Sequence, residues 1–479
     1  MSRQNTRQQR SARHKKIKDI KNKKVYTLAG LKIMTKSRDI DILNGKTASN
    51  LIRFAIPIAL SAMLQQLFNS ADTAVVGRFA DANALGAVGT NSEIAGLLVS
   101  LSSGLSVGVN VIVSRYIGSK QTKYIKDSIH TAILISLIFG IFVGILGQFI
   151  ARPIMFAIHT DAKILEQAAT YLRLYFASYP FLLLYDFVSA ILRAKGDSKR
   201  PFFALLASGI LNVILNLVFV ICFKMDVAGV GLSTVISTGF SSIIVLILLA
   251  KEKNEFQFSP KKLKLSGKIT SNILKVGIPA AVQGAAFCFA NIFIQSAVNI
   301  FGAMATAGNS VAVTFEYFAY YTVTAFGQAV TTFISQNYAC GNTERCKKIF
   351  RQCLVFSLVS TAMLTTPLTV FKEFFVSIFA TDQTALHYAS IRIFMILMFQ
   401  PICALYEIPA GAMRAYGHSL LPSVIALSGI CVTRISWIIF VFPHLQTYPG
   451  LLFIHPFSWV ITSTAMWIAF AIIKKKQKI

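Results

Sequence analysis

The sequence is poor in charge, and poorest in acidic charge. Only 14% of its 479 residues are charged, 54% are hydrophobic, and 19 Asp and Glu stand against 47 Lys and Arg. This composition excludes an ordinary soluble enzyme and indicates a polytopic membrane protein. A formal net charge of +28 would suit a nucleic-acid-binding protein, but the basic residues form short clusters between apolar segments. Loops at a membrane surface have this pattern, so we expect no nucleic-acid partner.

The sequence also lacks the motifs of enzymes and of ATP-driven pumps. It has no GxxxxGK[ST] phosphate-binding loop, no HExxH, and no Ser, His and Asp in the order of a catalytic triad. We therefore expect a protein that is not an enzyme, needs no cofactor and draws its energy from an ion gradient. Its seven cysteines include no CxxC pair and no companion histidines at metal-ligand spacing. This arrangement predicts neither a disulfide nor a metal site.

Long apolar segments are the main positive feature of the sequence. Each is long enough to cross a bilayer as a helix, which takes about 20 residues. Twelve such spans are predicted, at residues 51–77, 87–117, 128–150, 168–195, 201–223, 229–250, 271–299, 307–338, 349–371, 388–414, 421–442 and 451–473. The expected fold class is therefore an all-α polytopic membrane protein with twelve transmembrane helices.

The loops alternate in charge along the chain. Lys and Arg gather at residues 120–126, 193–200, 251–268, 345–351 and 474–478, whereas the intervening loops hold about one each. By the positive-inside rule, both termini of this multi-pass protein lie on the cytoplasmic side of the inner (plasma) membrane.

The first 33 residues are basic and contain no apolar stretch, so they are not a secretory signal. A disordered tail, a tail that rests on anionic lipid, and a start of the mature chain at Met34 all fit this composition.

The chain repeats itself at a spacing of 221 to 222 residues. Tyr185-Asp186 recurs as Tyr406-Glu407, and the turn that starts at Arg193 recurs at Arg414. Six spans fall in each half, so both halves enter the membrane from the same side, as in a parallel repeat. The expected divisions are a basic tail, an N-lobe, a linker, a C-lobe and a second basic tail, at residues 1–50, 51–250, 251–270, 271–473 and 474–479.

Three motifs make this organisation more specific. AD-T-VVGRF closes the first span, and LRAKGDSKRP and MRAYGHSLLP end the fourth and tenth. With twelve spans in two repeats, they resemble the multidrug and toxic compound extrusion (MATE) family, and its bacterial branch in particular. The resemblance implies an antiporter, monomeric by default, that expels small organic, often cationic, compounds in exchange for H⁺ or Na⁺. It also implies a V-shaped pair of lobes that open alternately to each side of the bilayer.

Asp72 is the leading candidate for the cation-coupling site. A carboxylate at the centre of a membrane helix costs about 2.5–3.5 kcal/mol by insertion scales, so it is kept where it lines a polar cavity or binds an ion. Ser61, Gln65 and Asn69 fall within about 80° of it on the same helix. Asp72 can take a proton, or it can hold Na⁺ with these neighbouring oxygens. The alternative is a carboxylate near the helix end that is merely solvated.

The resemblance agrees, because Asp72 matches the first-helix acid that MATE proteins use for coupling. In the second half, Ile294 stands at the repeat position of Asp72, which predicts that the coupling ion is confined to the first half.

Other polar residues of the first half are expected to complete this site. Asp186 is a second acid on the fourth span; its alternative role is to pair with Arg193 and support the turn. Asn212 and Asn216 on the fifth span are candidate neutral ligands, with helix–helix hydrogen bonding as their alternative. The full predicted cation-coupling set is Asp72, Asn69, Gln65, Asp186, Asn212 and Asn216.

Acidic and aromatic residues of the second half are expected to contact a cationic substrate, through charge pairing and cation–π contacts. Glu407, the repeat mate of Asp186, and Glu316 are the acids; pairing with Arg414 or Arg434 is their alternative. The full predicted substrate-binding set is Gln283, Asn291, Glu316, Tyr320, Gln400 and Glu407, with Tyr175 and Tyr179 from the first half.

Two rival functions and one structural assignment complete these expectations. A lipid-linked oligosaccharide flippase of the same superfamily would need a cavity rich in Lys and Arg, whereas the embedded acids here outnumber the evident bases, with Arg434 the main exception. A non-transporting membrane scaffold would not need a polar stripe in its first span. Gly196 and Gly417 are expected to close helices in a left-handed conformation within structural turns.

Overall fold

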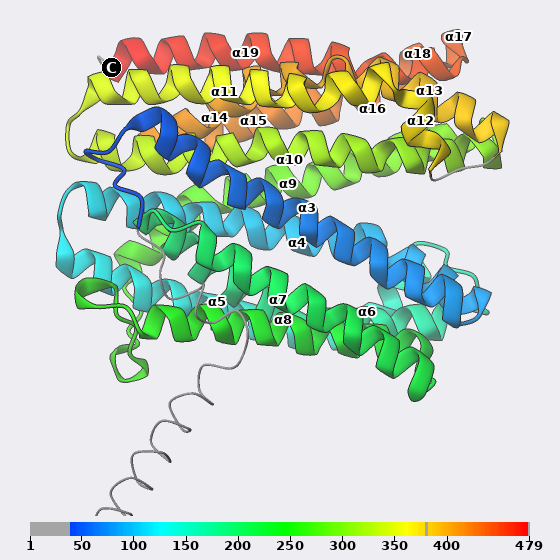
Figure 1. Cartoon of the computed structure of the whole chain (residues 1–479), viewed down its shortest axis with the longest axis horizontal. Helices are drawn as coiled ribbons and strands as arrows, with labels where there is room; N and C mark the ends of the chain where they lie inside the picture. Colours follow the sequence, from blue (N-terminus) through cyan, green and yellow to red (C-terminus); the bar gives the residue numbers. More distant parts are fainter. Residues whose placement is uncertain (1–38, 379–381, 478–479) are drawn as a thin grey trace, which may run out of the picture. The chain divides into compact units, whose positions relative to one another are not determined.

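A computed structural model describes residues 39–378 and 382–477 of the chain (Figure 1). Most of the predicted basic tail, residues 1–38, and the last two residues lie outside these ranges. The described ranges consist of helices and their connections and contain no strand. The prediction of an all-α polytopic membrane protein is confirmed.

Each predicted span of the first half is a helix. The helices are α3 (Thr47–Phe79), α4 (Ala82–Gly118), α5 (Thr122–Ala157), α6 (Leu165–Lys195), α7 (Lys199–Leu217) and α8 (Asp226–Ala250). A π-helical turn, η1 (Val218–Cys222), prolongs α7. The linker to the second half contains two 3₁₀ turns, η2 (Asn254–Phe256) and η3 (Pro260–Lys262).

The second half begins with three long helices and becomes more irregular towards its end. The long helices are α9 (Gly267–Asn299), α10 (Ala303–Ala339) and α11 (Thr343–Val370), followed by the short α12 (Lys372–Ser377). The tenth predicted span is α13 (Gln383–Leu397), η4 (Gln400–Ile402) and α14 (Cys403–Tyr416). The eleventh is α15 (Leu420–Ala426), η5 (Leu427–Val432), α16 (Thr433–Ser436), η6 (Trp437–Val441) and α17 (Phe442–Leu445). The last is α18 (Tyr448–Leu452) and α19 (Ile454–Gln477).

Eleven helical segments of the described ranges are long and apolar enough to cross a membrane. The twelfth predicted span coincides with α10, which has the length but is not among the eleven. Its sequence carries Asn309, Glu316 and many hydroxyl residues, and these make it more polar than the others. The layout of twelve spans in two lobes remains a prediction.

The first helix of each half contributes to both main hydrophobic clusters of the fold. The start of α3, at Leu51 and Phe54, packs in the cluster formed mostly by the second half, whereas its end, at Val75, packs in the cluster of the first half. The ring of Phe54 meets Phe333 of α10 edge to face at 5.3 Å. In the opposite sense, α9 begins at Ile273 in the first cluster and ends in the second. These two helices therefore connect the halves.

Polar contacts join the halves at the end of the bundle where the basic loops lie, which we call the basic-loop end. Asn110 of α4 accepts a hydrogen bond from the hydroxyl of Thr332 of α10 at 2.8 Å. The side chain of Gln336 donates to the carbonyl of Ala194 at 2.6 Å, and that of Arg115 to the carbonyl of Ala415 at 2.7 Å. The halves are thus joined by hydrogen bonds at this end.

Close backbone packing adds to these contacts. A Cβ atom at Gly108 of α4 would lie 2.2 Å from the carbonyl oxygen of Ile273 of α9. Only glycine permits so close an approach of the two helices.

The described chain starts with a short segment, residues 40–45, that contacts both halves at the same end; we call it the leading segment. The amide of Ile40 donates to the carbonyl of Gly196 at the end of α6. The carbonyl of Ile42 accepts from Arg345 at 3.1 Å and from Asn337 at 3.3 Å. Ile42 itself is 2% exposed, so the leading segment is part of the folded structure.

The two repeated turns have the predicted conformation. Gly196 and Gly417 both have φ of 104°, in the left-handed region, and each ends its helix. The first turn also carries an ion-pair cluster that ties it to the end of α8. Glu252 lies 2.6 Å from Lys195 and 2.5 Å from Arg200, and Arg200 also pairs with Asp197.

This cluster generates a prediction on stability. Burial alone raises the pKa of Glu252, but the hydrogen bond from Lys195 and the charge of Arg200 outweigh it, so its pKa lies below the ordinary 4.5. A carboxyl with a lowered folded-state pKa stabilises the fold above its unfolded pKa and loses that effect as the pH falls through the folded pKa. Glu252→Gln should therefore lower the free energy of unfolding by about 1–3 kcal/mol at neutral pH.

The measurement is thermal unfolding of the purified protein at a series of pH values. The difference between wild type and Glu252→Gln should vanish at acidic pH. Glu344→Gln, which breaks an ion pair with Lys347 in which Glu344 is 82% exposed, should leave the unfolding temperature unchanged. An unfolding temperature of Glu252→Gln equal to that of wild type at pH 7 would contradict the prediction.

Candidate functional site

Asp72 is buried in the first half and is held by an amide from another helix. It is 6% exposed, and its Oδ1 accepts a hydrogen bond from the Nδ2 of Asn216 of α7 at 2.5 Å. The same Nδ2 lies 3.3 Å from the Oδ1 of Asn212, one turn earlier on α7. Three of the six predicted cation-coupling residues thus form one hydrogen-bonded group, which we call the Asp72 group. No Lys, Arg or His among the described residues pairs with this carboxylate.

One oxygen of the Asp72 group has no donor. Asn216 is fully buried, and its Oδ1 accepts no hydrogen bond from the described residues. Because buried amide oxygens normally have a partner, this atom can accept a bond from a protonated carboxyl or serve as a ligand of a hard cation.

The two predicted neighbours of Asp72 on its own helix lie elsewhere. Asn69 is exposed and Gln65 is half-buried, and no hydrogen bond joins either side chain to Asp72. In their place, Tyr171 and Tyr175 of α6 lie within electrostatic range of the carboxylate. Three residues of separation on a helix leave enough angle for Asn69 to lie outside the buried sector.

Asp186 has a different partner from either of those predicted. It is half-buried and accepts a hydrogen bond from the hydroxyl of Ser102 of α4 at 2.6 Å. Arg193 lies within electrostatic range but forms no ion pair with it within 4 Å. Tyr175 is also within range of both Asp72 and Asp186, so the two acids share one side of α6. Tyr179, next to Asp186 in the same sense, is 1% exposed.

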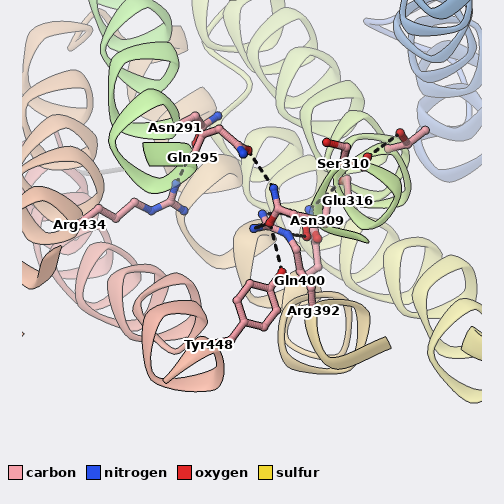
Figure 2. A network of polar contacts seen from close by, with 10 residues as sticks. Asn291, Gln295, Asn309, Ser310, Glu316, Arg392, Gln400, Arg434 and Tyr448 are labelled. Atoms are coloured by element: carbon pink, nitrogen blue, oxygen red, sulfur yellow. Dashed lines mark hydrogen bonds and ion pairs between the residues drawn. The ribbon is translucent and has the colours of Figure 1, made fainter. Parts of the chain in front are cut away.

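In the second half, Glu316 is paired with an arginine that the sequence prediction omitted. Arg392 of α13 binds both oxygens of Glu316, at 2.5 and 2.9 Å, and its Nη1 lies 2.6 Å from the Oδ1 of Asn309. The hydroxyl of Tyr448 meets the same oxygen, and the Nε2 of Gln400 donates to the carbonyl of Glu316. Figure 2 shows this network. The expected alternative partners, Arg414 and Arg434, are not used.

Glu407 is also paired, and here the predicted alternative is confirmed. Its Oε1 lies 3.3 Å from Arg414, and the same guanidinium donates to the Oε1 of Gln283 of α9 at 3.0 Å. Tyr320 lies within electrostatic range of this pair. The two acids predicted to receive a cationic substrate are therefore both neutralised by arginines.

Arg434 on α16 has no acidic partner. Its Nη1 donates to the Oδ1 of Asn291 at 3.3 Å and its Nε to the hydroxyl of Ser458 at 3.4 Å. With Arg392 and Arg414 it is one of three buried arginines of the second half. The expectation that embedded acids outnumber embedded bases is wrong for this half. The signal for Arg392 was present, because it is a single charge inside the apolar segment 388–399.

A second acid that the sequence prediction missed is Glu93 of α4. It is exposed and lies within electrostatic range of Tyr317 of α10 and Cys288 of α9. The rings of Tyr317 and Tyr321 stack at 5.9 Å, and the hydroxyl of Tyr321 donates to Gln66 of α3 at 3.3 Å. These residues bring an acid and two aromatic rings together from both halves. We call them the inter-half cluster.

The Glu316–Arg392 pair generates a prediction on stability. Arg392 is 4% exposed and the Glu316 side chain 12%. Removal of one member leaves an uncompensated buried charge, so Arg392→Met should lower the free energy of unfolding by about 3–5 kcal/mol. The double variant Glu316→Gln/Arg392→Met should regain most of this loss.

Thermal unfolding of the three purified proteins tests it. Arg152→Gln, which breaks an exposed pair with Glu166, is the matched control and should not change the unfolding temperature. A double variant as unstable as Arg392→Met alone would show that the pair's charges are not what stabilises this region.

Comparisons with known proteins agree with this architecture. The sequence model of the MatE family matches the chain twice, at residues 57–218 and 279–439. "Probable multidrug resistance protein YoeA" of Bacillus subtilis is 25% identical over 435 residues, which cover 89% of this chain and 94% of that protein. Multidrug export protein MepA of Staphylococcus aureus is 21% identical over 393 residues, with coverage of 81% and 86%.

Two solved structures share the fold. A crystal structure of MATE in complex with MaL6 has a TM-score of 0.86 at 18% identity and covers 92% of this chain and 100% of its own. A MOP superfamily transporter from Pyrococcus furiosus, described as having a binding pocket of reverse polarity, has a TM-score of 0.83 at 18% identity, with coverage of 92% and 98%. The double match of the family model covers more than half of the chain, and the chain therefore belongs to the MatE family, as a bacterial MATE transporter.

Proposed function

We propose that the protein is a cation-coupled antiporter that exports organic compounds in exchange for H⁺ or Na⁺. The observation that carries the proposal is the Asp72 group: a buried carboxylate in a membrane helix that is hydrogen-bonded to an amide and paired with no cation among the described residues. A structural carboxylate at this depth would be expected to have an arginine or lysine partner. Asp72 is therefore available to an ion that comes and goes.

The chemistry at Asp72 follows from its partners. When ionised, the carboxylate accepts from Asn216, as in the structure. When protonated, it can donate to an oxygen, and the Oδ1 of Asn216 lacks a donor. For Na⁺, the Asp72 carboxylate and the amide oxygens of Asn212 and Asn216 are hard oxygen ligands of the required type. Either ion changes the charge of the site from negative to neutral.

Exchange then requires that ion and substrate favour different states. The contacts between the halves gather at the basic-loop end, through Asn110–Thr332, Gln336–Ala194 and Arg115–Ala415. This arrangement supports a state closed at that end, and alternation requires these contacts to break. The coupling arises because ion and compound differ in affinity for the two states. A membrane potential supplies about 2.3 kcal/mol per charge per 100 mV.

The inter-half cluster is the proposed contact for the cationic part of a substrate. Glu93 supplies negative charge, and the stacked rings of Tyr317 and Tyr321 supply aromatic faces that attract cations. The predicted contacts Glu316 and Glu407 are less available for this task, because each is bound to an arginine. Gln283, Asn291, Tyr320 and Gln400 remain proposed neutral contacts.

A flippase for an anionic lipid is the second candidate function. Three buried arginines in the second half favour it, and a structural relative is described as having a binding pocket of reverse polarity. Two of those arginines are neutralised by glutamates, which leaves Arg434 as the single uncompensated base among them. The unpaired Asp72 supports antiport more directly.

The first test of the proposal is Asp72→Asn. The variant cannot change its charge, so gradient-driven dye efflux from proteoliposomes should fall to the level of protein-free vesicles, while insertion and thermal stability are retained. A pH gradient and a sodium gradient are imposed one at a time, and efflux under only one of them identifies the ion. Asp81→Asn is the control: it makes the same change at the exposed N-cap of α4, where Asn caps as well as Asp. Wild-type efflux by Asp72→Asn would refute the coupling role.

The second test fixes the halves at the basic-loop end. In a cysteine-free background, Asn110→Cys/Thr332→Cys should form a disulfide that stops efflux when oxidised and restores it when reduced, because alternation needs these residues to separate. The control pair, Asn91→Cys/Ala168→Cys, joins α4 and α6 within one half, where Asn91 bonds the carbonyl of Ala168 at 3.0 Å. It should leave efflux unchanged. Full efflux by the cross-linked Asn110–Thr332 pair would show that the halves do not separate there.

A further inference from the structure

Arg434 is the buried charge that the proposed mechanism does not use. It is 6% exposed, and no carboxylate of the described residues lies within 4 Å of it. Its two hydrogen bonds go to neutral oxygens, of Asn291 and Ser458, at the long distances of 3.3 and 3.4 Å. The other buried arginines of this half, Arg392 and Arg414, each have a glutamate. Arg434 alone among the three is left without a counter-charge.

The guanidinium also retains unused donors. Arginine has five N–H groups in a planar fork, and only Nε and one Nη1 hydrogen have partners here. Nη2 has no hydrogen-bond partner among the described residues and is not among the fully enclosed atoms without one. Asn291 is half-buried, so the site has a partly exposed side. A buried charge with free donors is costly unless an opposite charge compensates it.

The local helix geometry marks the same place. Arg434 lies on the four-residue α16, between the π-helical turns η5 and η6. Such turns in α-helices are rare and frequently occur at functional sites. They distort the helix on both sides of Arg434, in an otherwise regular membrane span.

The internal repeat gives an independent argument. In the first half, α3 and α7 are joined through Asp72 and Asn216, with Asn212 one turn away. In the second half, the equivalent helices are joined through Asn291 and Arg434. At the spacing of 222 residues, Arg434 corresponds to Asn212 and Asn291 to Asn69.

The position equivalent to Asp72 in the second half is Ile294, which is apolar. The same helix pair therefore holds a lone negative charge in one half and a lone positive charge in the other. Figure 2 shows Arg434 and Asn291 beside the neutralised Glu316–Arg392 network.

We propose that Arg434, with Asn291, forms an anion-binding subsite that takes the carboxylate or phosphate group of an amphiphilic compound. The two free Nη2 hydrogens and the second Nη1 hydrogen provide the donors for such a group. The compound is a diffusible organic acid or zwitterion, or an anionic phospholipid headgroup; the chemistry recognised is the same. As a statement about cargo this rests on the proposed function, but the binding itself does not depend on coupling.

A matched pair of dyes tests the subsite. Tetramethylrhodamine carries a free carboxylate, and its methyl ester does not, while the cationic ring system is shared. Equilibrium binding of both to the purified full chain is measured by fluorescence anisotropy, without any gradient. Wild type should bind the acid more tightly than the ester. Arg434→Gln should weaken binding of the acid about ten-fold or more, with the affinity for the ester unchanged.

Control variants separate charge from structure. Arg78→Gln removes one positive charge at the exposed end of α3 and should alter neither affinity. Arg434→Lys keeps the charge and should retain the preference for the acid. If Arg434→Gln does not fold, the wild-type ratio decides: equal affinity for acid and ester overturns the proposal. An equal loss of both dyes in Arg434→Gln also overturns it, because Arg434 would then only support the fold.

Two further arms identify the ligand and isolate the mechanism. Short-chain phosphatidylglycerol that displaces the acid from wild type through Arg434 assigns the subsite to a lipid headgroup. Failure to displace assigns it to a diffusible acid, and both outcomes support an anion site. Asp72→Asn should bind the acid dye like wild type. A wild type that binds the acid selectively but shows no gradient-driven efflux would refute antiport and leave the subsite standing.

Discussion

The membrane-spanning part of this protein depends on how each buried charge is compensated. A charge removed from water needs an opposite charge or several hydrogen bonds, and most charges here have them: Glu316 has Arg392, and Glu407 has Arg414. Two do not. Asp72 has only an amide and Arg434 only neutral oxygens. The paired charges hold helices of the second half together, and the unpaired ones are the places where charge from outside the protein is expected to enter.

The helices that carry these charges follow from the repeat. In each half, the first helix starts in the hydrophobic cluster of the other half and ends in its own. Asp72 lies near the end of α3 and Asn291 near the end of α9, so both are in the portion that packs within their own half. A change at either site therefore acts on a helix whose other end is held by the opposite half, and this provides a direct mechanical connection between ion binding and the joint between halves.

The sequence predicted the helices well because long apolar segments specify membrane spans almost alone. It also predicted Asp72, since a lone acid in such a segment is conspicuous. The partners were harder. Asn69 shares a helical sector with Asp72 by angle but is exposed, and the actual partner, Asn216, comes from a helix 144 residues away. Arg392 and Glu93 were missed for the same reason: periodicity describes one helix at a time, whereas the pairing of Arg392 with Glu316 is decided by how two helices pack.

The leading segment, residues 40–45, is held to the end of α6 through Ile40 and to α10 and α11 through Ile42. Any rearrangement that moves these helices apart must detach it from one of them. The stretch of chain before the first membrane helix is thus a strap over the joint. Anything fused to or docked on the N-terminal side would pull on this strap, so that forces applied outside the membrane would bias which state the transporter adopts.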